Sequence, residues 1–225
     1  MCGRYYRQSD KQAIAEHFAA NLYDFELQDS YNIAPQSTQP VVRVNRDSGE
    51  REVALLRWGL IPYWSNDTSI GYSNINARGE TVATSTLYRE AFKRRRCLVP
   101  ASGFYEWKKL DAKQKQPYAV RVKDASLCAF AGVWESWKDK ATQQTLETYS
   151  IITTEPNELT AAIHDRMPAI LPRRDYARWL APLEAARPPI DLLRPYPAEE
   201  MIAWKVGAEV GNARNDSPEL LRECA

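Results

Sequence analysis

The second residue of the chain is a cysteine, and its place beside the chain start gives it two reactive groups. Removal of Met1 would leave Cys2 with a free α-amine next to its thiol. Such a 1,2-aminothiol condenses with an aldehyde, because the amine forms a Schiff base and the thiolate then closes a thiazolidine ring. An α-amine has a pKa of about 7.7–8.0 and is partly unprotonated at neutral pH. A terminal cysteine also suits an amidase nucleophile that uses its own amine as base, and a residue without a chemical role is the third interpretation.

Two further residues are of types that transfer protons. Glu106 lies in the run Gly103–Trp107, where aromatic neighbours predict partial desolvation and a raised carboxyl pKa suited to acid–base catalysis. The alternative is a strand residue that faces water. His164, at the start of His164–Pro168, can donate a proton or bind phosphate, or be an ordinary surface histidine. The other histidine, His17, follows the apolar repeat of a predicted helix and is interpreted as structural.

Polar and basic residues supply candidate binding groups. Alternation along 74–81 places Asn76 and Arg78 on one side of the chain. Asparagine offers a donor and an acceptor, and the arginine fork fits phosphate; hydrogen bonds that stabilise the loop are the alternative. The basic run 93–96 is typical of a solvated face. It could also extend into a cationic stripe with interleaved rings, suited to single-stranded nucleic acid, through Arg43, Arg46, Arg57, Tyr31, Trp58, Tyr63 and Trp64.

Composition excludes several classes of protein. The chain has 225 residues, 44% hydrophobic and 26% charged, which is ordinary for a folded globular domain. Its net charge is +1, so any nucleic-acid site must be a local patch. The four cysteines, at 2, 97, 128 and 224, form no closely spaced pair, and two histidines make a zinc site improbable. We expect no metal, no cofactor, no membrane span and no signal peptide, and a reducing, cytoplasmic compartment.

The predicted elements must bring these residues together. Helices are predicted at 10–20, 84–93, 156–163 and 172–180, and a long loop at 59–80. A hairpin is predicted from 41–44 and 52–58, and further strands at 96–100, 104–108, 118–122, 127–134, 148–153 and 201–206. No linker or repeat divides the chain. We therefore expect one strand-rich α+β domain over 1–225.

Six ordered segments together resemble the SOS response-associated peptidase (SRAP) family. They are Met1–Arg4, Tyr31–Pro35, Trp58–Pro62, Asn76–Thr81, Gly103–Trp107 and His164–Pro168, and 206–215 resembles the closing segment of the family. The resemblance implies a curved, barrel-like antiparallel sheet with peripheral helices. It also implies capture of abasic sites in single-stranded DNA, because the ring-opened abasic sugar is an aldehyde.

The same resemblance implies roles for individual residues. Cys2 would form a thiazolidine crosslink after autoproteolytic removal of Met1, and Glu106 would move protons in that removal, in ring closure and in lyase-like reversal. Asn76 would hold the sugar and the N-terminus, and His164 would assist sugar ring opening. Phosphate or other DNA contacts are implied for Arg4, Arg78, Asn32, Pro35, Trp58 and Trp64.

The chain departs from the family pattern at one place, and two other functions compete with abasic-site capture. Trp64 is followed by Ser65–Asp67, which contains no cation, so a phosphate contact from this stretch is in doubt. An N-terminal-nucleophile peptidase or amidase would use the same Cys2, Asn76 and Glu106. A non-covalent reader of modified DNA bases would retain its binding after Cys2→Ala. The predicted protein is a monomer associated with the bacterial nucleoid.

Overall fold

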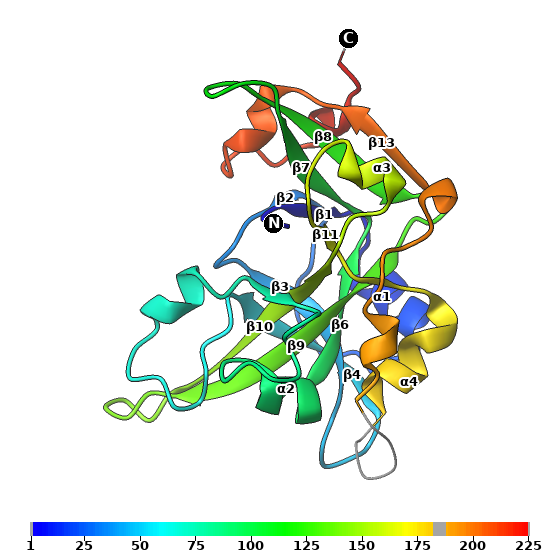
Figure 1. Cartoon of the computed structure of the whole chain (residues 1–225). Coiled ribbons are helices and arrows are strands. Elements are labelled where there is room, and N and C mark those ends of the chain that lie inside the picture. Colours follow the sequence, from blue (N-terminus) through cyan, green and yellow to red (C-terminus); the bar gives the residue numbers. More distant parts are fainter. Residues whose placement is uncertain (1, 182–187, 225) are drawn as a thin grey trace.

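The computed structural model describes residues 2–181 and 188–224, and a closed five-stranded barrel lies at its centre (Figure 1). Neighbouring strands pair in the order β4-β3-β6-β9-β10, and β10 also pairs with β4. Four of these pairings are antiparallel, whereas β10 runs parallel to β4. The strands are β3 (Thr38–Val44), β4 (Arg51–Trp58), β6 (Arg96–Ala101), β9 (Cys128–Lys138) and β10 (Thr145–Thr154). The strand-rich, barrel-like fold expected from the sequence is confirmed.

The hairpin β3–β4 shows how the sequence specifies the barrel. Asn45 Oδ1 accepts hydrogen bonds from the backbone amides of Asp47 and Ser48, at 2.9 and 3.1 Å, and shapes the turn. Gly49 follows with φ +73°, a conformation that favours glycine. The strands on either side pair over seven positions, from Thr38 to Val44, so the hairpin predicted at 41–44 and 52–58 is confirmed with longer strands.

A second, antiparallel sheet lies over the upper end of the barrel in Figure 1. Its order is β13-β8-β7-β1-β2, with β1 (Tyr5–Arg7), β2 (Ser30–Ile33), β7 (Gly103–Lys109), β8 (Lys115–Val122) and β13 (Met201–Lys205). The sequence predicts β7, β8 and β13 but not β1 or β2. All three residues of β1 are buried, so this strand lacks the alternation that reveals a half-exposed strand.

The helices are shorter than the sequence predicts. They are α1 (Lys11–Phe18), α2 (Arg89–Arg94), α3 (Glu158–Ala161) and α4 (Tyr176–Leu180). Helix α1 begins where Asp10 caps the amide of Ala13 at 2.8 Å and ends at Ala19 in the left-handed conformation. Over the part of the chain that the structure describes, no helix is long and apolar enough to cross a membrane.

Short elements complete the fold. The 3₁₀ turns are η1 (Ser69–Tyr72), η2 (Arg173–Asp175), η3 (Ile190–Leu192), η4 (Ala198–Glu200), η5 (Ala208–Gly211) and η6 (Pro218–Leu221). The short strands are β5 (Asn76–Arg78), β11 (Met167–Pro168) and β12 (Ile170–Leu171). Two of them, β5 and β11, pair with β10, so the long predicted loop 59–80 ends as a strand on the barrel.

The two faces of the barrel strands pack into different apolar clusters. Val42 belongs to a cluster with Phe18, Phe92 and Trp179, which come from α1, α2 and α4. The neighbouring Val41 points the other way, into a cluster that joins the barrel to the second sheet. This second cluster contains Cys2, so the start of the chain is anchored where barrel and sheet meet.

Candidate functional site

Cys2 lies fully buried just before β1 and packs among apolar residues that include Trp58 and Tyr149. Strand β1 pairs with β7 with Tyr5 opposite Phe104, and Arg4 accepts a backbone hydrogen bond from Tyr105 at 3.0 Å. Continuing this register places Gly3 opposite Glu106, and the Glu106 carboxyl group is close enough for its charge to act on the Cys2 thiol. Burial raises the pKa of the Cys2 thiol and the charge of Glu106 raises it further, whereas a backbone hydrogen bond from Arg4 lowers it. The thiol is therefore protonated and needs a base to react.

Glu106 is a buried carboxyl group on β7 and is only 3% exposed. Burial raises its pKa to about 7, and the charge of Asp165 contributes in the same direction, while a backbone hydrogen bond from Trp107 opposes the shift. Its neighbour Tyr105 is also buried. The structure thus desolvates this carboxyl group as its aromatic neighbours predict, and the alternative of a residue facing water is wrong. A carboxyl group with this pKa both accepts and donates protons near neutral pH.

Asn76 lies on β5 opposite Ile151 of β10. Its Nδ2 donates to the carbonyl of Ile75 at 3.0 Å, and its own carbonyl accepts from the Tyr88 hydroxyl at 3.0 Å. Its Oδ1 is buried and has no hydrogen-bond partner among the described residues. The backbone is therefore held firmly while one side-chain acceptor remains available to a ligand.

His164 follows α3, whose first turn is closed by a capping box at Asn157. The imidazole Nδ1 accepts a hydrogen bond from the Arg166 amide at 3.0 Å and lies 2.9 Å from an Asp165 carboxylate oxygen. The two neighbours favour opposite protonation states of Nδ1. Partial burial outweighs the Asp165 charge and lowers the pKa of His164, which favours the neutral ring. Asp165 acts on both His164 and Glu106, which places the three in one neighbourhood.

Arg4 and Asn32 form a polar link to the C-terminal segment. Arg4 Nη1 donates to Asn32 Oδ1 at 2.9 Å and to the carbonyl of Val210 at 3.3 Å. Asn32 Nδ2 donates to the carbonyls of Val210, Asn212 and Asn215. Asn32 is thus a buried tether that orients Arg4, and its side chain is occupied within the protein. The nearby Pro35 is partly exposed.

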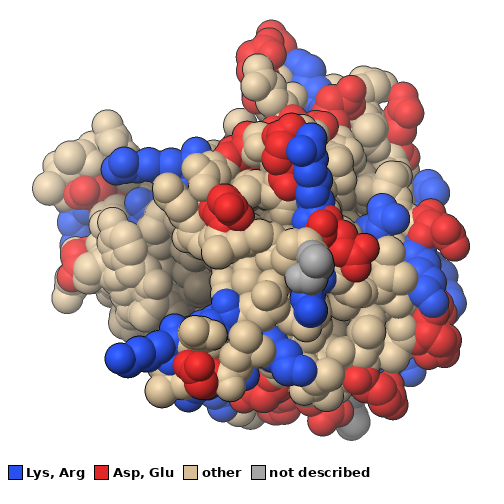
Figure 2. All heavy atoms as spheres, turned by 90° about the horizontal axis from the view of Figure 1, so that it is seen from above, with Lys and Arg blue, Asp and Glu red and all other residues tan. Residues whose placement is uncertain are grey.

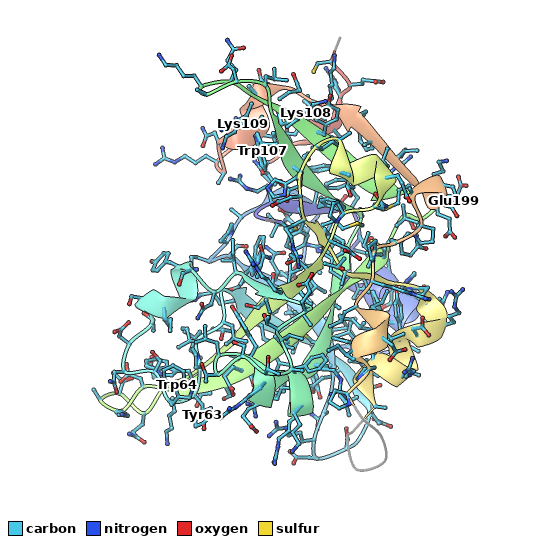
Figure 3. All side chains as sticks on the ribbon, in the orientation of Figure 1. Tyr63, Trp64, Trp107, Lys108, Lys109 and Glu199 are labelled. Atoms are coloured by element: carbon cyan, nitrogen blue, oxygen red, sulfur yellow. The ribbon has the colours of Figure 1, made fainter. Side chains whose placement is uncertain are left out.

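The remaining predicted DNA contacts lie in different environments. Trp58 is fully buried and donates from Nε1 to the carbonyl of Ile75 at 2.9 Å. Its ring packs edge-on against Tyr5, with the two ring centroids 5.3 Å apart. Its ring offers no free face to a base in this conformation. Trp64 is 49% exposed, and Figure 3 shows it with Tyr63 at the other end of the molecule from Trp107. Arg78 is exposed on β5.

The continuous basic and aromatic stripe considered from the sequence does not form. Arg43 is paired with Glu52 at 2.7 Å and with Glu147 at 2.8 Å, and Arg95 with Glu135 at 2.5 Å. Arg96 and Trp58 are buried. Spacing along the chain could not show Glu147 and Glu135, which come from distant strands, whereas Glu52 lies directly opposite Arg43 in the β3–β4 hairpin.

One contact at the site was not anticipated from the sequence. Arg166 binds both carboxylate oxygens of Glu80, at 2.6 and 2.9 Å, and donates to the Thr153 carbonyl at 2.7 Å. It therefore fastens the His164 segment to the chain that follows β5. Both residues lie within the six quoted segments, but nothing in their spacing identifies them as partners.

One face of the molecule is hollowed, and cations lie along its borders (Figure 2). Seen from above, Figure 2 shows a hollowed area bordered on two sides by Lys and Arg side chains. Among the described residues there is no cluster of three or more His, Cys, Asp or Glu that could hold a metal ion. The buried thiol, the adjacent carboxyl group and the nearby imidazole are arranged for proton transfer and nucleophilic attack.

Comparison with known proteins gives one consistent family. The model of the family "SOS response associated peptidase (SRAP)" matches residues 1–213. The chain is 41% identical over 224 residues to abasic site processing protein YoqW of Bacillus subtilis (strain 168), covering 98% of this chain and 99% of that protein. It is 35% identical to abasic site processing protein HMCES of Xenopus tropicalis, over 87% of this chain and 66% of that protein. A crystal structure of a Bacteroides thetaiotaomicron protein is similar over the full length of both chains, with 29% identity and a TM-score of 0.89.

Proposed function

Because this chain belongs to the SOS response associated peptidase (SRAP) family, we propose that it processes abasic sites in DNA by bonding them covalently to Cys2. Relatives that match almost the whole chain carry the name abasic site processing protein. The observation that carries the proposal is the buried Cys2 thiol beside Glu106, a carboxyl group whose pKa is raised to about 7. A nucleophile and a proton carrier are thereby paired at the start of the chain.

The proposed reaction is a condensation that releases one water. Hydrolysis of the Met1–Cys2 peptide bond first frees the α-amine of Cys2. The amine adds to the aldehyde carbon of the ring-opened abasic sugar, and loss of water gives an imine. The thiolate then adds to the imine carbon, and the imine nitrogen takes up a proton. The product is a thiazolidine in which nitrogen and sulfur are both bonded to the former aldehyde carbon.

Glu106 is suited to the proton transfers of each step. As a carboxylate it accepts the thiol proton, which burial otherwise holds on Cys2. As a carboxylic acid it protonates the departing hydroxyl group during imine formation. A pKa of about 7 populates both forms at neutral pH, which is the condition for efficient general acid–base catalysis. The same exchange would serve autoproteolytic removal of Met1 and slow, lyase-like reversal of the crosslink.

Three further residues have roles that follow from their positions. His164 is partly exposed, so its imidazolium form can protonate the sugar ring oxygen as the ring opens and leave as the neutral ring, which burial favours. Asn76 offers its buried Oδ1 to the Cys2 amine or to a sugar hydroxyl. Arg78 is exposed and can bind the adjacent phosphate.

The substrate is proposed to be single-stranded DNA. A missing base leaves a gap in the stack that can turn toward a pocket at little cost. The cations around the hollowed area in Figure 2 would attract the backbone. The proposal places the protein with the DNA of the cell, in the cytoplasm and at the nucleoid of a bacterium, and needs only a monomer.

A denaturing gel tests this function directly. The protein is mixed with a labelled single-stranded oligonucleotide that carries one abasic site, with undamaged and double-stranded oligonucleotides as controls. We expect a shifted band that survives detergent and heat, is absent with Cys2→Ala and persists with Cys224→Ala. A band of full yield with Cys2→Ala would contradict the proposal. No band from protein shown by mass to lack Met1 would favour the amidase alternative, to be tested with peptide and amide substrates.

A further inference from the structure

A second concave site lies away from Cys2, between the β3–β4 hairpin and the ends of α2 and α4. Its cavity has a volume of about 530 Å³, within the range of roughly 300–1,000 Å³ typical of small-molecule sites. The charged and aromatic residues that line it are Arg46, Lys93, Arg94, Arg96 and Trp134. Four of these five are cations, and no carboxylate among the described residues lines the cavity.

Arg96 gives the wall of this cavity a fixed positive charge. Its side chain is buried, and its guanidinium donates to the backbone carbonyls of Phe92 and Lys93 at the end of α2 and of Trp179 and Ala181 around the end of α4. These carbonyls satisfy its donors but carry only partial charges. Within residues 2–181 and 188–224 it forms no ion pair with a carboxylate.

The neighbouring cations divide into two sets. Arg43 and Arg95 have close acid partners, at 2.7 and 2.5 Å. Arg46 and Lys93 are exposed and form no ion pair over the described residues, while Arg94 reaches Glu90 only at 3.8 Å, across an exposed turn. Among the described residues, Arg46 and Lys93 at the mouth of the cavity thus have no ion-pair partner, although the charge of Arg46 acts on Glu135, and they point to an anion as a further partner.

Trp134 lines the same cavity but is only 7% exposed, because the Arg43 guanidinium lies over its ring, 4.2 Å from the centroid. The guanidinium carbon of Arg46 lies 5.6 Å from the centroid of the Trp134 ring, so this cation is held against an aromatic surface at the rim. A site lined by four cations and of this volume suits a ligand that carries a phosphate group. We propose that this cavity binds phosphate-bearing ligands of about nucleotide size, independently of the Cys2 site.

The phosphate could come from a free nucleotide or from the backbone of a DNA strand, and calorimetry separates these sources. Deoxyadenosine monophosphate, sodium pyrophosphate and an undamaged single-stranded oligonucleotide are each titrated into the full-length protein. The test variant is Arg46→Ala with Lys93→Ala. The matched control is Arg121→Ala with Lys123→Ala, which also removes one exposed arginine held over a tryptophan, here Trp204 at 5.9 Å, and one exposed lysine.

We expect the test variant to weaken binding about tenfold or more, as the loss of two charge-assisted contacts implies, and the control to change it less than twofold. If the test variant binds the mononucleotide or pyrophosphate more weakly than wild type does, the ligand is a free phosphate compound. If the test variant binds only the oligonucleotide more weakly than wild type does, the ligand is the backbone of a DNA strand. Equal affinity of wild type and test variant for all three probes, or no binding of any, would overturn the proposal. Because every probe lacks an abasic site, these results are independent of crosslinking at Cys2.

Discussion

Two buried glutamates, in different parts of the molecule, show how the surroundings determine what a carboxyl group does. Glu106 lies on β7 beside Cys2, and Glu135 lies on β9, where it is 4% exposed. Burial raises the pKa of both, but the Glu135 carboxylate is paired with Arg95 at 2.5 Å and accepts a hydrogen bond from the Ser136 amide. The charge of Asp165 raises the pKa of Glu106 further, and the charge of Glu106 in turn raises the pKa of the Cys2 thiol.

The difference separates a structural role from a chemical one. A carboxylate held by a guanidinium stays ionised and helps to fix the geometry of its strand. A carboxyl group with a pKa of about 7 gains and loses a proton at little cost at neutral pH. Burial alone therefore does not identify a catalytic residue, and it is burial close to the Cys2 thiol that supports the role proposed for Glu106.

The largest expected effect is on the reaction rate. Glu106→Gln retains the shape of the side chain but cannot exchange a proton, so we expect crosslinking to slow by about 100- to 10,000-fold. Glu135→Gln should leave the rate within about threefold. Single-turnover gels at pH 7, with Met1 removal verified by intact mass, measure both. An equal loss in the two variants would remove the distinction between the glutamates.

For stability, we expect the substitution at Glu135 to have the larger effect and the substitution at Glu106 the smaller. Glu135→Ala leaves the Arg95 guanidinium without its partner, and we expect the free energy of unfolding to fall by about 3–5 kcal/mol. Glu106→Gln should not destabilise the protein at pH 8. Urea denaturation of both variants checks this. A Glu135→Ala variant as stable as wild type would show that the ion pair is not structural.

The pH dependence of stability should single out Glu106. Its pKa is about 7 in the folded state and ordinarily 4.5, so between these values the folded protein holds a proton that the unfolded chain has released. Stability therefore falls as pH rises through this window, by about 3 kcal/mol from this group. Glu106→Gln should abolish that part of the slope. Unfolding at a series of pH values between 4.5 and 8 would contradict this if wild type and variant had parallel profiles.

The smallest expected effect concerns an exposed cation. Arg78→Ala removes one proposed phosphate contact, so binding of an undamaged single strand should weaken a few-fold. The slope of the logarithm of the binding constant against the logarithm of the salt concentration should decrease in magnitude by about one. Arg121→Ala, also exposed, should change neither. Fluorescence anisotropy at several salt concentrations distinguishes them, and an unchanged slope for Arg78→Ala would remove Arg78 from the DNA contacts.

The sequence predicts the local parts of this molecule better than the long-range ones. The β3–β4 hairpin follows from alternation and turn residues near in the chain, and the environment of Glu106 follows from its aromatic neighbours. The β1 strand is missed because it is buried on both faces. The lengths of the helices are missed because their ends depend on backbone caps, such as the left-handed Ala19 after α1, which the apolar periodicity does not reveal. Trp58 illustrates the limit at the site, since only the fold shows that its indole is hydrogen-bonded to Ile75 and not available to DNA.

Mass spectrometry of the trapped product tests the central claim most directly. The crosslink formed with an abasic oligonucleotide is isolated, digested with protease and nuclease, and sequenced by fragmentation. We predict that Met1 is absent and that residue 2 carries the sugar remnant with the loss of one water, as a thiazolidine requires. A remnant attached to a lysine or to Cys97, Cys128 or Cys224, or a product that retains Met1, would contradict the account.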